Sequence, residues 1–143
     1  MSTRAAVIVK LANGKYQGIY NHSDGYGLLP HLQTIAPTQA QAEQLVALGS
    51  CSMIYGCTRI APIGKHNFNE MEDGTVIAYH RDRQESWDHC KPITAAKWLT
   101  VAKKIDHTGY AYVFENGQWS MYQSGGYGEN KFALVQPEVE VTV

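Results

Sequence analysis

Two short polar blocks in this sequence contain most of the side chains that could carry out chemistry together. The first block covers residues 19–26 and the second covers residues 78–85, and each follows a run of strand-forming residues. Strand ends are places where a rigid scaffold can hold polar groups in a shared cleft. The candidate catalytic residues are His22, Asp24, His80 and Asp82. If the blocks meet, two imidazoles and two carboxylates could perform acid–base hydrolysis or hold a divalent metal ion.

The first block supports two interpretations. His22 and Asp24 stand two residues apart, and on an extended strand this spacing places both side chains on one face. A carboxylate beside an imidazole can orient it as a general base near neutral pH. The run Asp24-Gly25-Tyr26 is also typical of a turn, because Asp bonds its own backbone and Gly accepts a positive φ. The residue types favour the turn.

The second block is an alternating string of charges. If it is extended, His80 and Asp82 point to one side and Arg81 and Arg83 point to the other. The arginine pair could then bind a carboxylate or a phosphate in bidentate fashion. Such a string is equally typical of a solvated edge, where ion pairs contribute little to stability. The sequence favours this second interpretation.

The cysteines do not indicate a metal site or a disulfide framework. Cys51, Cys57 and Cys90 are odd in number and have none of the paired spacings of zinc sites. Free cysteines most often serve as small core residues, and their presence fits a reducing compartment. We therefore expect no metal centre and no bound cofactor.

The elements that must position the two blocks begin and end with hairpins. Asn13-Gly14 and Asn116-Gly117 are each flanked by strand-forming runs, and an Asn-Gly pair in this setting is the strongest short-range hairpin signal. The flanking runs are residues 5–11 and 16–20 for the first pair, and 110–114 and 118–122 for the second. Further strands are predicted at residues 52–55, 75–80 and 131–136, with 75–80 as a central strand.

Two helices are predicted between the hairpins. Thr38 can cap a run of good helix formers that Gly49 ends. Residues 94–105 repeat apolar side chains at helical spacing, and Thr94 is available as their cap. We therefore predict one α+β domain spanning residues 1–143, in which a largely antiparallel β-sheet built from hairpins packs two α-helices on one face.

Charge and hydropathy exclude several classes of function. The chain has 12 Lys and Arg residues against 13 Asp and Glu residues, a net charge of −1, which disfavours broad nucleic-acid binding. No segment approaches the roughly 20 apolar residues that span a bilayer. The apolar run at residues 5–9 is too short for a signal peptide. We expect a cytoplasmic protein that does not bind membranes.

The order of these motifs resembles a family of small uncharacterised proteins encoded by bacteriophages and prophages. The resemblance rests on a His-x-Asp-Gly-Tyr block at residues 22–26 followed by a Tyr-His-Arg-Asp-Arg block at residues 79–83, and it covers most of the chain. No activity comes with this resemblance. It implies an accessory protein of a phage that acts in the host bacterial cell.

These observations favour a non-enzymatic accessory protein that binds and modulates a host bacterial protein, with inhibition of a defence system as one form of that function. The chain lacks a complete catalytic motif, so an enzyme is the less favoured class. The binding candidates, chosen as residue types enriched at hot spots or as their charged neighbours, are Tyr26, Arg81, Arg83, Glu85, Trp87 and Tyr127. The alternative is a small hydrolase, or a nucleotide- or metal-binding protein, that uses the His-Asp cleft.

Overall fold

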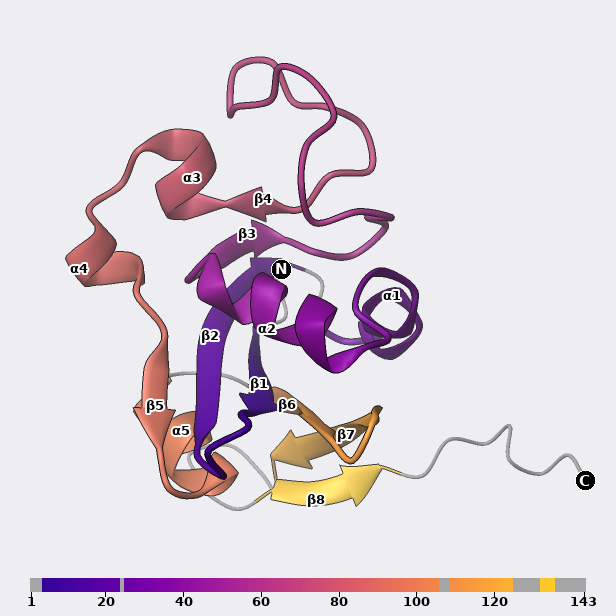
Figure 1. Ribbon diagram of the computed structural model, residues 1–143, viewed down its shortest axis with the longest axis vertical. Coiled ribbons are helices and arrows are strands. Elements are labelled where there is room, and N and C mark those ends of the chain that lie inside the picture. The colour runs from indigo at the N-terminus through magenta and orange to yellow at the C-terminus, as the bar shows by residue number, and fades with distance from the viewer. Residues whose placement is uncertain (1–3, 24, 106–108, 125–131, 136–143) are drawn as a thin grey trace, which may run out of the picture.

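The computed structural model describes residues 4–23, 25–105, 109–124 and 132–135, which form a mixed α+β fold (Figure 1). Within these ranges the strands are β1 Ala5–Lys10, β2 Tyr16–Ser23, β3 Cys51–Met53, β4 Ile77–Ala78, β5 Ile93–Ala95, β6 Tyr110–Glu115, β7 Gln118–Ser124 and β8 Phe132–Val135. The helices are α1 Leu29–Ile35, α2 Gln39–Ala47, α3 Tyr79–Arg83, α4 Trp87–Cys90 and α5 Trp98–Lys104. None of these helices is long and apolar enough to cross a membrane.

The strands form one sheet in the order β4-β3-β2-β1-β6-β7-β8, and β5 pairs with β2. Most neighbours are antiparallel, as predicted, but β1 pairs with β6 and β2 pairs with β3 in parallel. Both predicted hairpins are confirmed. Asn116 and Gly117 have φ values of 56° and 80°, the two positive angles that a type I′ hairpin turn requires.

Helices cover both faces of the sheet. Strand β1 is buried on both sides, with Val7 and Val9 facing the core under α1 and α2 and with Ala6 and Ile8 facing α5. This explains its continuous apolar sequence, which a strand with one solvated face does not need. The two predicted helices, now α2 and α5, therefore lie on opposite faces, and the prediction that both pack on one face is corrected.

Helix α2 follows the sequence prediction closely. The Thr38 side chain accepts a hydrogen bond from the Gln41 backbone N–H, which is the expected N-cap contact. Gly49 follows the helix with a φ of 83°. A Cβ atom there would also clash with the backbone carbonyl of Cys90, so two independent constraints require glycine at this position.

Two other predicted elements are shorter than the sequence suggested. The predicted central strand 75–80 is wrong, because only Ile77–Ala78 forms a strand, at the end of the sheet before the chain turns into α3, while Thr75 makes an isolated bridge with Arg59. The predicted helix 94–105 begins at Trp98 instead, with Lys97 in place of Thr94 at the N-cap. Residues 93–95 pair with Tyr16–Gly18 on the part of the β2 edge that β3 leaves open.

Candidate functional site

Among the described residues, the two polar blocks do not meet in one cleft. Strand β3 separates them, because Cys51 pairs with Asn21 of β2 on one side and with Ala78 of β4 on the other. Neighbouring strands lie about 4.8 Å apart, so the backbones of the two blocks are about 10 Å apart. Asp24 and Tyr127 lie outside the described residues. Among the residues that the structure describes, no hydrogen bond or ion pair joins the first block to the second.

His22 makes its side-chain contact within its own strand. Its Nδ1 atom lies 2.8 Å from the Tyr20 hydroxyl, and the two rings are 6.0 Å apart at their centroids. Residues two apart on a strand share one face, which explains the contact. The predicted pairing of His22 with Asp24 lies outside the described residues, and the described partner of the imidazole is a tyrosine.

The second block is helical, which overturns its interpretation as an extended string. His80 and Asp82 both belong to α3, whose C-cap residue Gln84 has a φ of 61°. His80 is exposed, its Nδ1 atom lies 2.7 Å from the Glu85 carbonyl oxygen, and its ring meets Trp87 edge-on at 5.0 Å. Asp82 is buried instead. Because a helix turns by about 100° per residue, these two side chains do not share a face.

Asp82 explains why the chain turns into a helix at this point. Its carboxylate, only 2% exposed, accepts hydrogen bonds from the backbone N–H of Ala78 at 2.8 Å and from Arg81 Nε at 2.9 Å. The bond to Ala78 satisfies a backbone donor at the N-cap of α3, as the acidic residue of a capping box does. Asp82 therefore stabilises the fold by holding the start of α3.

Arg81 is also used internally. Besides its bonds to Asp82, its Nη1 atom donates to the Ile60 carbonyl at 2.8 Å and its Nη2 atom donates to the Val76 carbonyl at 2.6 Å. Together these bonds tie the loop before β4 to helix α3. The guanidinium fork is occupied by these partners, so Arg81 is not the available anion-binding residue that the sequence suggested.

His66 completes the surroundings of Asp82 and was missed in the sequence. Its ring is fully buried, and its Nε2 atom lies 3.4 Å from Asp82 Oδ2. Nδ1 accepts a hydrogen bond from the Glu72 backbone N–H at 2.8 Å. A neutral ring with that acceptor carries its proton on Nε2, and within the described residues this buried atom makes no hydrogen bond. His66 stands 16 residues before Asp82, and no local pattern connects them.

Glu72 organises the same loop from its other side. Its carboxylate accepts hydrogen bonds from the backbone N–H groups of Ile63 and Gly64 at 2.8 and 2.7 Å, from the Thr75 hydroxyl and from Arg59 Nε. The Ile63 donor, followed by those of Thr75 and Gly64, lowers the pKa of Glu72 to about 2. We call the following set the polar loop network: Arg59, His66, Glu72, Arg81 and Asp82.

Side chains on this segment remain available at the surface. Trp87 is 40% exposed on α4. Arg83 is exposed on α3, with Nε 3.1 Å from Glu85 Oε2 and its guanidinium 5.2 Å from the centre of the Phe68 ring. Ile63 and Met71, which the sequence did not single out, are 80% and 58% exposed on the loop. We call Ile63, Met71, Arg83 and Trp87 the loop-end residues; they lie on the loop before β4 and on helices α3 and α4, which follow β4 (Figure 1).

Tyr26 lies on a different part of the molecule. It is 64% exposed after the end of β2, and its ring centroid is 5.5 Å from that of Tyr110 on β6. The loop-end residues lie on the segments before and after β4, an edge strand on the other side of β2 in the strand order. The predicted binding residues are thus divided between two places, and only those near α3 and α4 are close together.

The cysteines carry no sign of reactivity. All three are buried and unpaired, and burial raises the pKa of Cys51 to about 12 and that of Cys57 to about 11. Such thiols are protonated at neutral pH and are poor nucleophiles. Within the described ranges, no group of three or more His, Cys, Asp and Glu side chains is placed to hold a metal ion.

Comparison with protein-family models, with curated proteins and with solved structures found no match to this chain. Its function is therefore argued from its own residues, and the phage resemblance rests on the two sequence motifs alone.

Proposed function

We propose that this chain is a phage-encoded, non-enzymatic accessory protein that binds and modulates a host bacterial protein in the host cytoplasm. Inhibition of a defence system is the form of modulation that we favour. The phage origin and the bacterial partner are expectations from the sequence resemblance. The observation that supports a binding role is the presentation of Trp87 and Arg83 on two short helices beside the polar loop network.

The network makes Arg83 suitable for binding because it fixes the backbone of α3. The Trp87 ring is positioned by its edge-on contact with His80 of the same helix α3. Asp82 bonds the start of α3, and Arg81 ties that helix to the carbonyls of Ile60 and Val76. A surface that is already ordered loses less conformational entropy when a partner docks. Tryptophan and arginine are also the residue types that most often dominate binding energy. We therefore assign the main contact to Trp87 and Arg83.

The alternative function, a hydrolase or a nucleotide- or metal-binding protein with a His-Asp cleft, receives less support. His22 and His80 are held by separate partners on either side of β3, and Asp82 is buried by its folding contacts. The residues that the structure describes therefore supply no cleft in which these groups cooperate.

The test is affinity purification of the tagged protein from bacterial lysate, with quantitative mass spectrometry of the retained proteins. The chain should retain one host protein at a constant ratio. Trp87→Ala and Arg83→Ala should each weaken its retention, since hot-spot truncations cost about 2 kcal/mol, or about 30-fold in affinity. Lys15→Ala is the matched control, because Lys15 is exposed on the turn between β1 and β2, away from α3 and α4.

Thermal melts of each variant show whether the fold is retained. Equal retention of the host protein by the wild type and by both α3 and α4 variants would contradict the assigned surface. Recovery of the chain without any stoichiometric host protein would contradict the binding function itself.

A further inference from the structure

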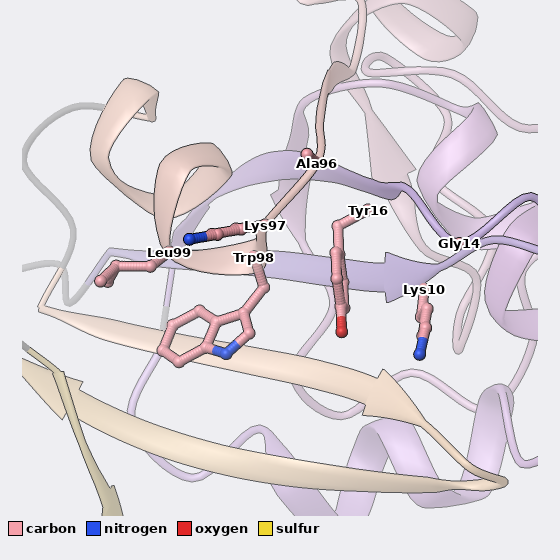
Figure 2. Close-up of a pocket in the computed structure, with 7 residues that line it drawn as sticks. All are labelled: Lys10, Gly14, Tyr16, Ala96, Lys97, Trp98 and Leu99. Carbon is pink, nitrogen blue, oxygen red and sulfur yellow. The ribbon is translucent and has the colours of Figure 1, made fainter.

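A cavity of about 390 Å³ lies on the α5 side of the sheet, at the end of β2 that pairs with β5 and not with β3 (Figure 2). It forms where the β1–β2 hairpin meets the segment joining β5 to α5. Its volume falls in the range of about 300–1,000 Å³ that small-molecule sites span. Its lining residues are Lys10, Gly14, Tyr16, Ala96, Lys97, Trp98 and Leu99.

Two aromatic rings form the walls of this cavity. Figure 2 shows Tyr16 and Trp98 projecting in the same direction, with Tyr16 between Trp98 and Lys10. Each ring is half-buried and held in place: Trp98 packs against Tyr122 with ring centroids 4.3 Å apart, and the Tyr16 hydroxyl donates to Glu115 Oε2 at 3.1 Å. Fixed aromatic faces of this kind favour a flat, ring-bearing ligand.

The charge of the cavity favours an anion. Lys10 is paired with Glu115 at 3.2 Å, so its charge is largely balanced. Lys97 is exposed, and within the described part of the chain its amine makes no ion pair or hydrogen bond. Figure 2 shows the Lys97 side chain beside Trp98, extending away from Tyr16. A ligand whose ring lies between the aromatic side chains could therefore reach an uncompensated positive charge beside Trp98.

We propose that this cavity binds a flat, ring-bearing anion of the nucleoside monophosphate class. The ring stacks against Trp98 and Tyr16, and the phosphate is drawn to Lys97. The phosphate contributes charge attraction and the base contributes stacking, so neither half alone binds as well as the whole. This inference rests on residues separate from those of the proposed protein-binding surface, and either can fail without the other.

The first test is a titration of the full chain with AMP, GMP, CMP and UMP, followed by NMR of the tryptophan indole N–H signals. Adenosine, inorganic phosphate and benzoate are the comparison probes. At least one nucleotide should bind about tenfold more tightly than each comparison probe, a difference expected from one base–aromatic stack or one charge contact. The Trp98 signal should shift, whereas those of Trp87 and Trp119 should not.

Variants assign the binding to the cavity. Trp98→Leu should weaken nucleotide binding about tenfold through loss of stacking. Lys97→Glu should weaken it at least as much, and it replaces an exposed side chain, so the fold should be retained even if Trp98→Leu is unstable. Lys103→Glu is the matched control, because Lys103 is an exposed lysine on α5 that does not line the cavity and its substitution changes the net charge equally.

Three results would overturn the proposal. One is the absence of binding by all four nucleotides at millimolar concentration. Another is an equal loss of affinity in Lys97→Glu and Lys103→Glu, because this would show attraction to overall charge alone. The third is benzoate binding as tight as that of the nucleotides, which would replace the nucleotide class with simple aromatic acids.

Discussion

The central strands and the segment that carries the polar loop network, residues 59–82, are held in place by different forces. Strand β1 is covered on both faces, and Ala5–Val9 are fully buried among apolar side chains. The segment that carries the polar loop network instead depends on carboxylates and arginines bonded to backbone groups. Apolar burial is non-directional and tolerant of pH, whereas a polar network requires defined geometry and charge. The apolar core reaches this segment at Ile60 and Val76, and the polar bonds hold the stretch between them, where no apolar residue that the structure describes is buried.

The largest loss of stability is expected when the polar loop network is broken at Asp82, its most buried carboxylate. Arg81→Ala leaves Asp82 without its main cationic partner, and removing one member of a buried pair costs about 3–5 kcal/mol. The free energy of unfolding, measured by urea denaturation, should fall by about that amount. Arg83→Ala is the control on the same helix. An unchanged denaturation midpoint for Arg81→Ala would show that the network contributes little stability.

A second prediction tests the hydrogen bonds of a buried tyrosine inside the apolar region. The buried Tyr112 hydroxyl donates to the Gly25 carbonyl at 2.6 Å and accepts from the Leu28 N–H at 3.2 Å. Tyr112→Phe leaves both backbone groups without this partner, at a cost of about 1–3 kcal/mol. Chemical denaturation measures this loss. An unchanged free energy of unfolding would mean that residues 25–28 shift to find other hydrogen-bond partners. The central region would then tolerate the loss of a buried hydrogen bond as well as it tolerates a change in apolar packing.

A third prediction concerns acid. Because hydrogen bonds lower the pKa of folded Glu72 to about 2, below its ordinary value, its carboxylate stabilises the loop at neutral pH. That contribution is lost as the pH falls from the ordinary range toward about 2. The amide signals of Ile63 and Gly64 should therefore titrate near pH 2 in NMR spectra. Titration of these amides above pH 4 would contradict the hydrogen-bonded arrangement, and Glu72→Gln should remove the transition.

The smallest change in stability is expected at Arg83, and it tests whether Arg81 and Arg83 have different roles. Arg83 is exposed and paired with Glu85 at the surface, and exposed pairs contribute about 0–1 kcal/mol. Arg83→Ala should therefore change the free energy of unfolding by at most about 1 kcal/mol while weakening partner binding. A large loss of stability would show that Arg83, like Arg81, stabilises the fold.

The local features of the fold could be predicted from the sequence. Asn13-Gly14 and Asn116-Gly117 specify their turns by backbone preference, and Thr38 marks the start of α2 by a contact three residues away. The ends of β4 and α5 could not be predicted in this way. They depend on the Asp82 bond to Ala78 and on the pairing of β5 with β2, which are tertiary contacts that override local propensity.

The candidate site was predictable in composition but not in arrangement. The sequence identified Arg83 and Trp87 as binding residue types, and both are exposed. It treated Arg81 and Arg83 as a pair, because the block was predicted to be extended. Helical geometry separates them into one internal and one external residue. The roles of His66 and Glu72 depend on the path of a long loop, for which the sequence contains no periodic signal.

The parallel pairing of β1 with β6 has a consequence for synthesis on the ribosome. Ala5 lies opposite Tyr110, so one edge of the first hairpin has no strand to pair with until residues 110–114 have been made. Contacts so distant in sequence form slowly, because a long loop must close first and its closure costs conformational entropy. During translation, the apolar residues of β1 stay partly uncovered and exposed to chaperones, and the sheet is completed only after residues 110–114 have been made.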